Sequence, residues 1–180
     1  MFQSHNIKKV MNMYNDVVIT APRQVGKTTA ICMYICDLIM ESKDFRIEVV
    51  CHNLSNAGMI CEKLAAAMKP IELGLQQKVG KYSIDVDSKN IKIQFRSTGS
   101  HPTYGYNNDP ELKYITIVDE GFFSNPVDVK NLVSDMQAKR KRIQGAGKWI
   151  VVSSMRENET SYPEEWSAFL KNFVKLSIPE

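Results

Sequence analysis

The chain has 180 residues, 43% of them hydrophobic and 24% charged, and its 23 Lys and Arg against 20 Asp and Glu give a formal charge of +3. This length suits one domain with a substantial core, and the composition excludes a disordered chain, a collagen repeat and a disulfide scaffold. Because the net charge is small, any nucleic-acid surface must be a local patch.

The cysteines and the apolar runs indicate the compartment. Cys32, Cys36, Cys51 and Cys61 lie in or beside apolar segments and lack the paired spacing of a zinc site, so we expect reduced core residues. The opening residues do not resemble a signal peptide, and no apolar run approaches the roughly 20 residues needed to cross a bilayer. We therefore expect a soluble protein that is not secreted and has no membrane partner.

Hydrophobic periodicity and turn residues predict alternating strands and helices. The expected strands are the apolar start of Val17–Ala30, Arg46–Cys51, a hairpin of Tyr82–Val86 and Ile91–Phe95, Tyr114–Glu120 and Lys148–Ser154. The expected helices are Thr28–Met40, Asn56–Lys69 stopped by Pro70, Val127–Arg142, and a last helix opened by Pro163 with Trp166, Phe169, Leu170 and Phe173 on one side. We expect a loop over Ser97–Pro110 and a turn at Gly145–Gly147. Strands without alternation, each followed by a helix, indicate a single α/β domain over residues 1–180 with a mainly parallel sheet flanked by helices.

The sequence APRQVGKTT lies between the first strand and its helix. Gly26, Lys27 and Thr28 match the second half of a phosphate-binding loop, while Ala21 replaces the glycine that usually begins the pattern. That glycine mainly eases a tight turn, which a small alanine also permits. The backbone N–H groups from Val25 to Thr28 and the Lys27 ammonium would bind phosphate, and the Thr28 hydroxyl would hold a hydrated Mg²⁺. The alternative is a Gly-Lys-Thr that occurs in a loop by chance.

A continuous apolar strand, YITIV, is followed by the two carboxylates Asp119 and Glu120. Ligands of open α/β folds bind at the carboxyl ends of the strands, so both side chains would lie at that edge. Asp119 would hold the water shell of Mg²⁺, and Glu120 would orient and deprotonate an attacking water as general base. An Asp-Glu pair after an apolar strand is by itself unremarkable, but here it follows a phosphate loop in an alternating α/β chain.

Two further segments supply candidate contacts. Ser153 and Ser154 end the strand IVVSS at the same edge and could contact the γ-phosphate or Glu120, although a plain serine turn is the alternative. Arg23, inside the phosphate loop, could stabilise the transition state of phosphoryl transfer or could form a structural salt bridge.

Near the N-terminus, Phe2 and Gln3 suit adenine, one by stacking and the other by pairing with the N6 and N7 edge, although alone they would indicate a disordered start. The chain resembles the ATPase domain of the large terminase subunit, the DNA-packaging motor protein of tailed bacteriophages and herpesviruses. The resemblance rests on four motifs in the family's order: Phe2-Gln3, the loop APRQVGKTT, the strand ITIVDE and Ser153-Ser154. RQVGKTT is the more specific part, since a phosphate loop with Asp-Glu occurs in many motor ATPases. The resemblance implies a P-loop NTPase fold of the ASCE class, RecA-like and terminase-like.

The resemblance also implies the roles of individual residues. The expected catalytic residues are Glu120, Lys27 and Arg23, the last as an arginine finger from within the same loop. Thr28 and Asp119 would hold Mg²⁺, largely through water. The expected ATP contacts are Phe2, Gln3, Arg23, Gln24, Val25, Gly26, Lys27, Thr28, Thr29, Asp119, Ser153 and Ser154. In this family the serine pair would couple hydrolysis to movement.

The resemblance implies partners as well. The family translocates double-stranded DNA into a preformed capsid as a homo-oligomeric ring, expected to be pentameric, with a portal protein and a small terminase subunit. The location would be the host cytoplasm during virion assembly, or the nucleus for a herpesvirus-like virus. Two features depart from the family: these 180 residues contain no RNase H-like nuclease domain, and the loop PTYGYNNDPELK before the Asp-Glu strand lacks the family's frequent Arg-Gly.

The densest basic cluster, Lys139, Arg140, Lys141 and Arg142, ends the predicted helix 127–142. Cations at a helix C-terminus are favoured by the helix dipole whatever the function. The alternative is that these side chains contact DNA phosphates or the nucleotide of a neighbour in a ring.

Other functions compete with the packaging motor. Another nucleic-acid-dependent motor ATPase, such as a helicase core fragment, would share these motifs, although a helicase needs a second RecA-like domain that 180 residues cannot hold. A nucleotide-binding assembly module that does not hydrolyse ATP would not need a general base such as Glu120. A small-molecule kinase fits least, since nothing resembling a lid or acceptor pocket follows the Asp-Glu strand.

Overall fold

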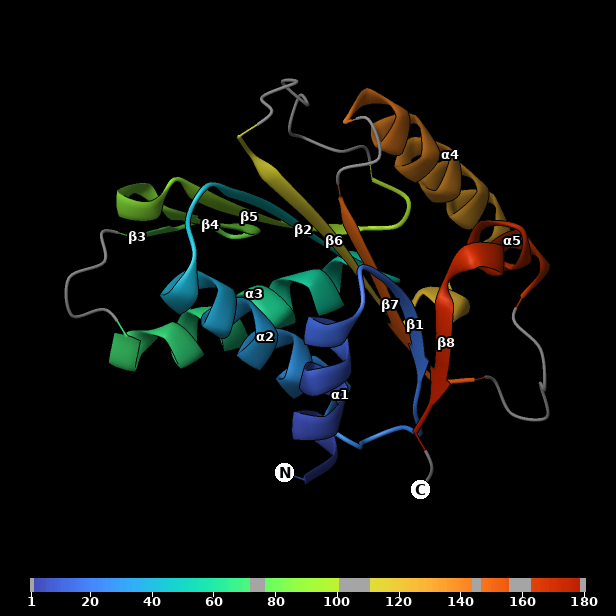
Figure 1. Cartoon of the computed structure of the whole chain (residues 1–180), viewed down its shortest axis with the longest axis horizontal. Coiled ribbons are helices and arrows are strands. Elements are labelled where there is room, and N and C mark those ends of the chain that lie inside the picture. Colours follow the sequence, from blue (N-terminus) through green and yellow to red (C-terminus); the bar gives the residue numbers. More distant parts are fainter. Residues whose placement is uncertain (1, 72–76, 101–110, 144–146, 156–162, 179–180) are drawn as a thin grey trace.

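The computed structural model describes residues 2–71, 77–100, 111–143, 147–155 and 163–178 of the chain. These residues form one eight-stranded sheet with helices on both faces (Figure 1). The predicted fold class, an α/β chain with a mainly parallel central sheet, is therefore confirmed. Most of the expected loop Ser97–Pro110 and of the turn Gly145–Gly147 lies outside the described residues.

The sheet has the strand order β3-β4-β5-β2-β6-β7-β1-β8. Its strands are β1 (Asp16–Thr20), β2 (Phe45–Cys51), β3 (Gln77–Val79), β4 (Ser83–Val86), β5 (Ile91–Ser97), β6 (Lys113–Asp119), β7 (Lys148–Ser153) and β8 (Val174–Ser177). The neighbouring strands β5, β2, β6, β7, β1 and β8 run parallel to one another. The strands β4 and β3 extend the sheet beyond β5 as antiparallel neighbours. The antiparallel pairing of β4 and β5 confirms the predicted hairpin. Because β7 lies between β1 and β6, the segments that follow these three strands meet at one edge of the sheet.

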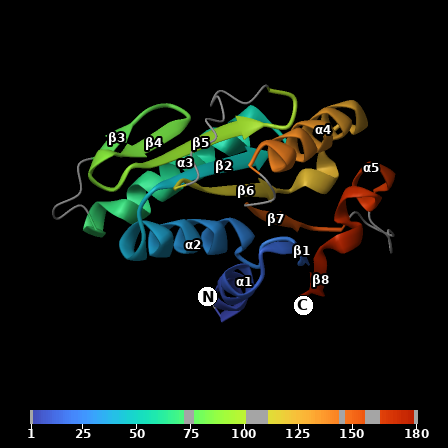
Figure 2. The same ribbon diagram turned by 45° about the horizontal axis from the view of Figure 1, so that its top comes forward.

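The helices divide between the two faces of the sheet (Figure 2). One face is covered by α1 (Phe2–Met13), α2 (Lys27–Glu41) and α3 (Leu54–Met68), and the other by α4 (Pro126–Arg142) and the short α5 (Glu164–Ser167). Alternate residues of each central strand point to opposite faces: Val17 and Ile19 of β1 join the core under α1, α2 and α3, whereas Val18 joins the core under α4 and α5. Burial on both faces explains why these strands are continuous apolar runs in the sequence.

The start of the chain is helical, contrary to the expectation from Phe2 and Gln3 alone. Both residues open α1, whose Ile7 and Met11 are fully buried in the core shared with α2. A short helix of this kind is stabilised by packing of its apolar face more than by its intrinsic propensity. The formation of α1 therefore depends on its packing against α2, and amino-acid composition does not show which segments pack together.

The predicted last helix begins after Pro163 as expected, but it is much shorter than expected. After Pro163 the chain forms only α5, then the 3₁₀ turn η4 (Phe169–Asn172) and the strand β8, which pairs with β1. Trp166 and Leu170 are buried in the core beneath α4, as are two nearby phenylalanines. The apolar spacing correctly indicated a buried face, but the short α5 and the turn η4 carry it here instead of one continuous helix.

The cysteines agree with the expectation of reduced core residues. All four cysteines are unpaired; Cys32, Cys51 and Cys61 are buried and Cys36 is half-buried. None of the helices in the described part of the chain is long and apolar enough to cross a membrane.

Candidate functional site

The loop between β1 and α2 has the backbone geometry that a phosphate loop requires. Gly26 has a φ of +90° and immediately precedes the first residue of α2. A Cβ atom added at Gly26 would lie 3.2 Å from the Cβ of Ser4 in α1, so this position favours glycine for both its backbone conformation and its close contact. The first turn of α1, which carries Gln3, therefore lies against the loop. The side chain of Phe2 is not among those described, and its predicted contact with adenine stays a prediction.

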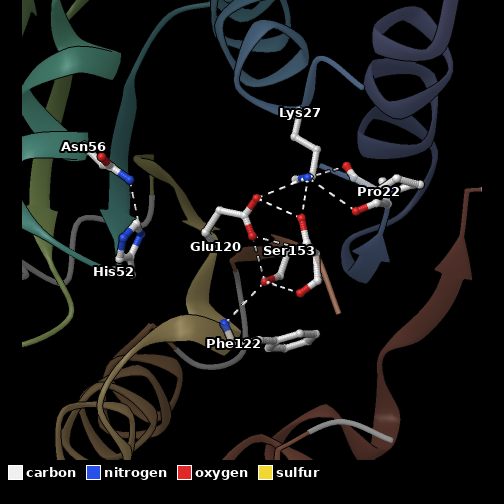
Figure 3. Close-up of polar contacts among 9 residues, drawn as sticks. Pro22, Lys27, His52, Asn56, Glu120, Phe122 and Ser153 are labelled. Atoms are coloured by element: carbon white, nitrogen blue, oxygen red, sulfur yellow. Dashed lines mark hydrogen bonds and ion pairs between the residues drawn. The ribbon is translucent and has the colours of Figure 1, made fainter. Parts of the chain in front are cut away.

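The Lys27 ammonium lies at the centre of the site (Figure 3). Lys27 is 5% exposed, and its Nζ lies 2.7 Å from the Pro22 carbonyl oxygen, 3.3 Å from the Ala21 carbonyl oxygen, 2.7 Å from Ser154 Oγ and 3.1 Å from Glu120 Oε1. An ammonium group has three N–H donors, so these four oxygens already meet its capacity. A phosphate that binds Lys27 would have to displace at least one of these oxygens.

Glu120 is held in one orientation by its backbone and by β7. Its φ of 54° and ψ of 34° are left-handed, a conformation that costs a residue with a side chain roughly 1–3 kcal/mol. The Glu120 N–H donates to the Val152 carbonyl oxygen at 2.8 Å. Oε2 accepts from the Ser154 N–H at 2.8 Å and from Ser153 Oγ at 3.2 Å, while Oε1 accepts from Ser154 Oγ at 3.1 Å. These contacts aim the carboxylate along the sheet edge toward the phosphate loop.

Asp119 is the buried carboxylate of the site. It is 4% exposed, its side chain accepts a hydrogen bond from Thr28, and its Oδ1 has no hydrogen-bond partner in the described part of the chain. Burial, and then the neighbouring Glu120, raise the pKa of Asp119 to about 7. A buried carboxylate oxygen without a partner beside a threonine hydroxyl fits a hard cation such as Mg²⁺, which prefers oxygen ligands.

The other predicted loop residues lie around this cluster. Arg23 and Gln24 are exposed, Gln24 with a left-handed φ of 64°, and Val25 packs against the core under α2. The Arg23 guanidinium carbon lies 5.2 Å from the centre of the Phe123 ring. The Thr29 side chain lines a groove of about 410 Å³ between α2 and α3. The structure thus brings Lys27, Thr28, Asp119, Glu120, Ser153 and Ser154 together, whereas Thr29 faces the groove.

Sequence reasoning missed the segment after Glu120. This segment is the 3₁₀ turn η3 (Gly121–Phe123), whose Phe122 N–H contacts Ser153 Oγ at 3.4 Å while Phe123 faces Arg23. Two aromatic residues that follow the carboxylates after one glycine, in the sequence DEGFF, were the available signal.

The basic cluster at the end of α4 serves the fold at two of its four positions. Lys139 is buried, and its Nζ lies 2.9 Å from Glu48 Oε2, so the hypothesis that it contacts DNA is wrong. Arg140 pairs with Asp16. Lys141 and Arg142 are exposed, and a role of these two in DNA binding stays a prediction.

No protein-family model matches this chain, and no curated protein sequence matches it. Solved structures match its fold. The large terminase of bacteriophage HK97 has a TM-score of 0.61 and 17% identity over 95% of this chain and 36% of that one. The large terminase ATPase domain of Thermus phage P74-26 has a TM-score of 0.61 and 10% identity over 96% and 79%. The DUF1998 helicase MrfA has a TM-score of 0.65 and 12% identity over 98% and 29%.

These identities are low, so the likenesses show the fold alone. The chain has the RecA-like ATPase fold that large terminase ATPase domains and helicases share, and the predicted resemblance to terminases is confirmed at this level. The chain spans about a third of the length of the HK97 terminase that it matches, 36%.

Proposed function

We propose that this chain is the ATPase domain of a viral DNA-packaging terminase, which hydrolyses ATP with Mg²⁺ to move double-stranded DNA into a capsid. The observation that carries the proposal is the mutual contact of Lys27, Glu120 and Ser154. These residues follow β1, β6 and β7, and they bring a cation, a carboxylate and a hydroxyl within hydrogen-bond distance at the carboxyl edge of the sheet. The fold shared with two phage large terminases supports the same function.

The groups of the chain divide the work of hydrolysis. Lys27 and the N–H groups at the start of α2 bind the phosphates, which draws Lys27 away from Glu120. Glu120 remains bonded to the Ser154 N–H and accepts a proton from a water molecule. The oxygen of this water bonds to the γ-phosphorus as the bond from the γ-phosphorus to its bridging oxygen breaks. Because Ser153 and Ser154 contact the same carboxylate, a change at the γ-phosphate reaches β7.

Two residues are suited to hold Mg²⁺. Asp119 presents a buried oxygen without a hydrogen-bond partner in the described residues, and its side chain accepts a hydrogen bond from Thr28. Bound Mg²⁺ would neutralise charge on the phosphate oxygens. Asp119 would hold it through water, and Thr28 would supply its hydroxyl, as the sequence predicts.

We propose the assembly on the same grounds. The working form would be a homo-oligomeric ring, pentameric when complete, on double-stranded DNA, with a portal protein and a small terminase subunit, in the host cytoplasm or nucleus. The terminase fold is its support. Sedimentation with duplex DNA and a non-hydrolysable ATP analogue should show a species larger than the monomer, and a monomer under every condition would count against the ring.

ATP turnover of the wild type and of Glu120→Gln, with and without duplex DNA, tests the function. Removing a general base lowers turnover by about 10²–10⁴-fold, while Glu120→Gln should still bind ATP. Glu164→Gln, which changes an exposed glutamate in α5, is the matched control and should leave turnover unchanged. If Glu120→Gln hydrolyses ATP at the wild-type rate, the general-base assignment is wrong. If both proteins bind ATP and neither hydrolyses it under any condition, the chain is a nucleotide-binding assembly module.

One observation favours a second candidate, a nucleic-acid-dependent motor of the helicase kind. The helicase MrfA matches the fold with a TM-score of 0.65, although this chain covers 29% of it. ATP turnover with closed circular duplex DNA and with single-stranded DNA separates the two candidates. Stimulation by the intact duplex supports the packaging motor, and stimulation by single strands alone supports the helicase fragment.

A further inference from the structure

A cation–π contact joins the phosphate loop to the segment after the catalytic carboxylate. The Arg23 guanidinium carbon lies 5.2 Å from the centre of the Phe123 ring, within the distance of about 6 Å at which a guanidinium is attracted to an aromatic face. Arg23 is exposed and Phe123 is half-buried. The ring is therefore partly covered by the protein, while the guanidinium that contacts it lies at the surface.

The two residues before Phe123 are held in place by contacts with Trp166. Gly121 accepts a hydrogen bond at its carbonyl oxygen from Trp166 Nε1 at 3.2 Å, and the Phe122 ring meets the Trp166 ring edge-on with centres 6.0 Å apart. Trp166 and Phe122 are both almost fully buried. Anchoring of the two preceding residues fixes the backbone from which Phe123 extends, three positions after Glu120.

The other partner also has a constrained backbone. Arg23 lies between Pro22, whose carbonyl oxygen accepts from Lys27 at 2.7 Å, and Gln24, whose φ is 64°. An arginine side chain nevertheless has many rotamers, and an exposed one loses much freedom when it must meet a phosphate. Stacking on a fixed ring removes part of this freedom in advance, which is the usual advantage of preorganisation.

We propose that Phe123 is a positioning residue for Arg23, holding the guanidinium beside the Glu120 segment so that it can stabilise charge on the transferring γ-phosphoryl group. This proposal rests on the ATPase function proposed above. Phe123 itself touches neither substrate nor the reacting atoms. The ring acts only through Arg23, so its effect must disappear when Arg23 is removed.

The test is the steady-state kinetics of ATP hydrolysis by a double-mutant cycle. Phe123→Leu keeps an apolar side chain of similar size and removes the aromatic face; kcat should fall about two- to fivefold with KM for ATP unchanged, as expected for an exposed cation–π contact. Phe123→Tyr restores an aromatic face and should restore kcat. In an Arg23→Ala background, Phe123→Leu should cause no further loss.

Each other outcome overturns the inference. If Phe123→Leu has the wild-type kcat, or lowers kcat equally with and without Arg23, the ring does not act through the guanidinium. If Phe123→Tyr is as slow as Phe123→Leu, the aromatic face is not what matters. Glu120→Gln measured in parallel separates the two proposals: turnover that depends on Glu120 but not on Phe123 refutes the positioning role alone. An inactive wild type refutes both.

Discussion

Replacing Lys139 by methionine removes one of the two cations that pair with Glu48 in a buried charge cluster between α4 and the sheet. Lys139 Nζ lies 2.9 Å from Glu48 Oε2 and 3.1 Å from Thr116 Oγ1, and Arg96 Nε lies 2.7 Å from Glu48 Oε1. The side chains of Lys139, Glu48 and Arg96 are 5%, 7% and 4% exposed. Methionine has an unbranched apolar side chain of similar length, so the substitution removes mainly the charge, together with the contact of Lys139 Nζ 5.6 Å from the centre of the Trp149 ring.

The expected loss of stability follows from the burial of Glu48, the partner that Lys139→Met leaves in place. Removing one member of a buried ion pair destabilises a protein by about 3–5 kcal/mol, because the other charge stays buried without full compensation. Glu48 keeps Arg96, so we expect the lower part of this range, about 3 kcal/mol in the free energy of unfolding. With a urea m-value of about 2 kcal/mol/M, the unfolding midpoint should fall by about 1.5 M.

Urea unfolding followed by circular dichroism measures this shift. The matched control is Lys141→Met, which changes an exposed lysine of the same helix and should alter the free energy of unfolding by less than about 0.5 kcal/mol. Equal midpoints for the two variants would refute the view that the buried pair stabilises α4 on the sheet.

The same cluster predicts an acid sensitivity. Burial alone disfavours the Glu48 carboxylate, but Lys139 and Arg96 outweigh burial and hold its pKa below the ordinary value of 4.5. The stabilisation from ionised Glu48 is therefore present above pH 4.5 and is lost as the pH falls through the lower folded-state pKa. Lys139→Met should shrink this loss at acid pH, and an unchanged acid limb would contradict the assignment.

Two further substitutions test the site. Asp119 has its pKa raised to about 7, so the folded protein keeps a proton that the unfolded chain releases near pH 4, and this group lowers stability as the pH rises from about 4 to 7. Asp119→Asn should remove that decline from urea unfolding curves, and an identical pH slope in both proteins would exclude it. Gly121→Ala would place a Cβ 2.7 Å from Val118 Cγ1 and 2.9 Å from Trp166 Cζ2, and such overpacking should cost about 1–3 kcal/mol. A thermal unfolding midpoint equal to that of the wild type would show that the turn adjusts freely.

Local sequence patterns predicted those elements of the fold that depend on residues close together in the sequence. The strand-loop-helix of the phosphate loop, the apolar strand before Asp119 and Glu120, and the hairpin at one end of the sheet follow from periodicity and turn residues within short windows. Continuous apolar strands also revealed a sheet buried on both faces, because alternation disappears when both sides of a strand are covered.

Which of these parts lie next to one another follows from the strand order of the sheet. The order of β6, β7 and β1 places Ser154 between Glu120 and Lys27, and no local pattern records which strands become neighbours. For the same reason, the end of the chain was expected to be a helix, although β8 pairs with β1 there. From sequence alone, a basic residue at a helix C-terminus is equally compatible with exposure to solvent, contact with DNA and pairing with a buried carboxylate. Lys139 is buried because Glu48, 91 residues away in sequence, lies opposite it across the packed face of the sheet.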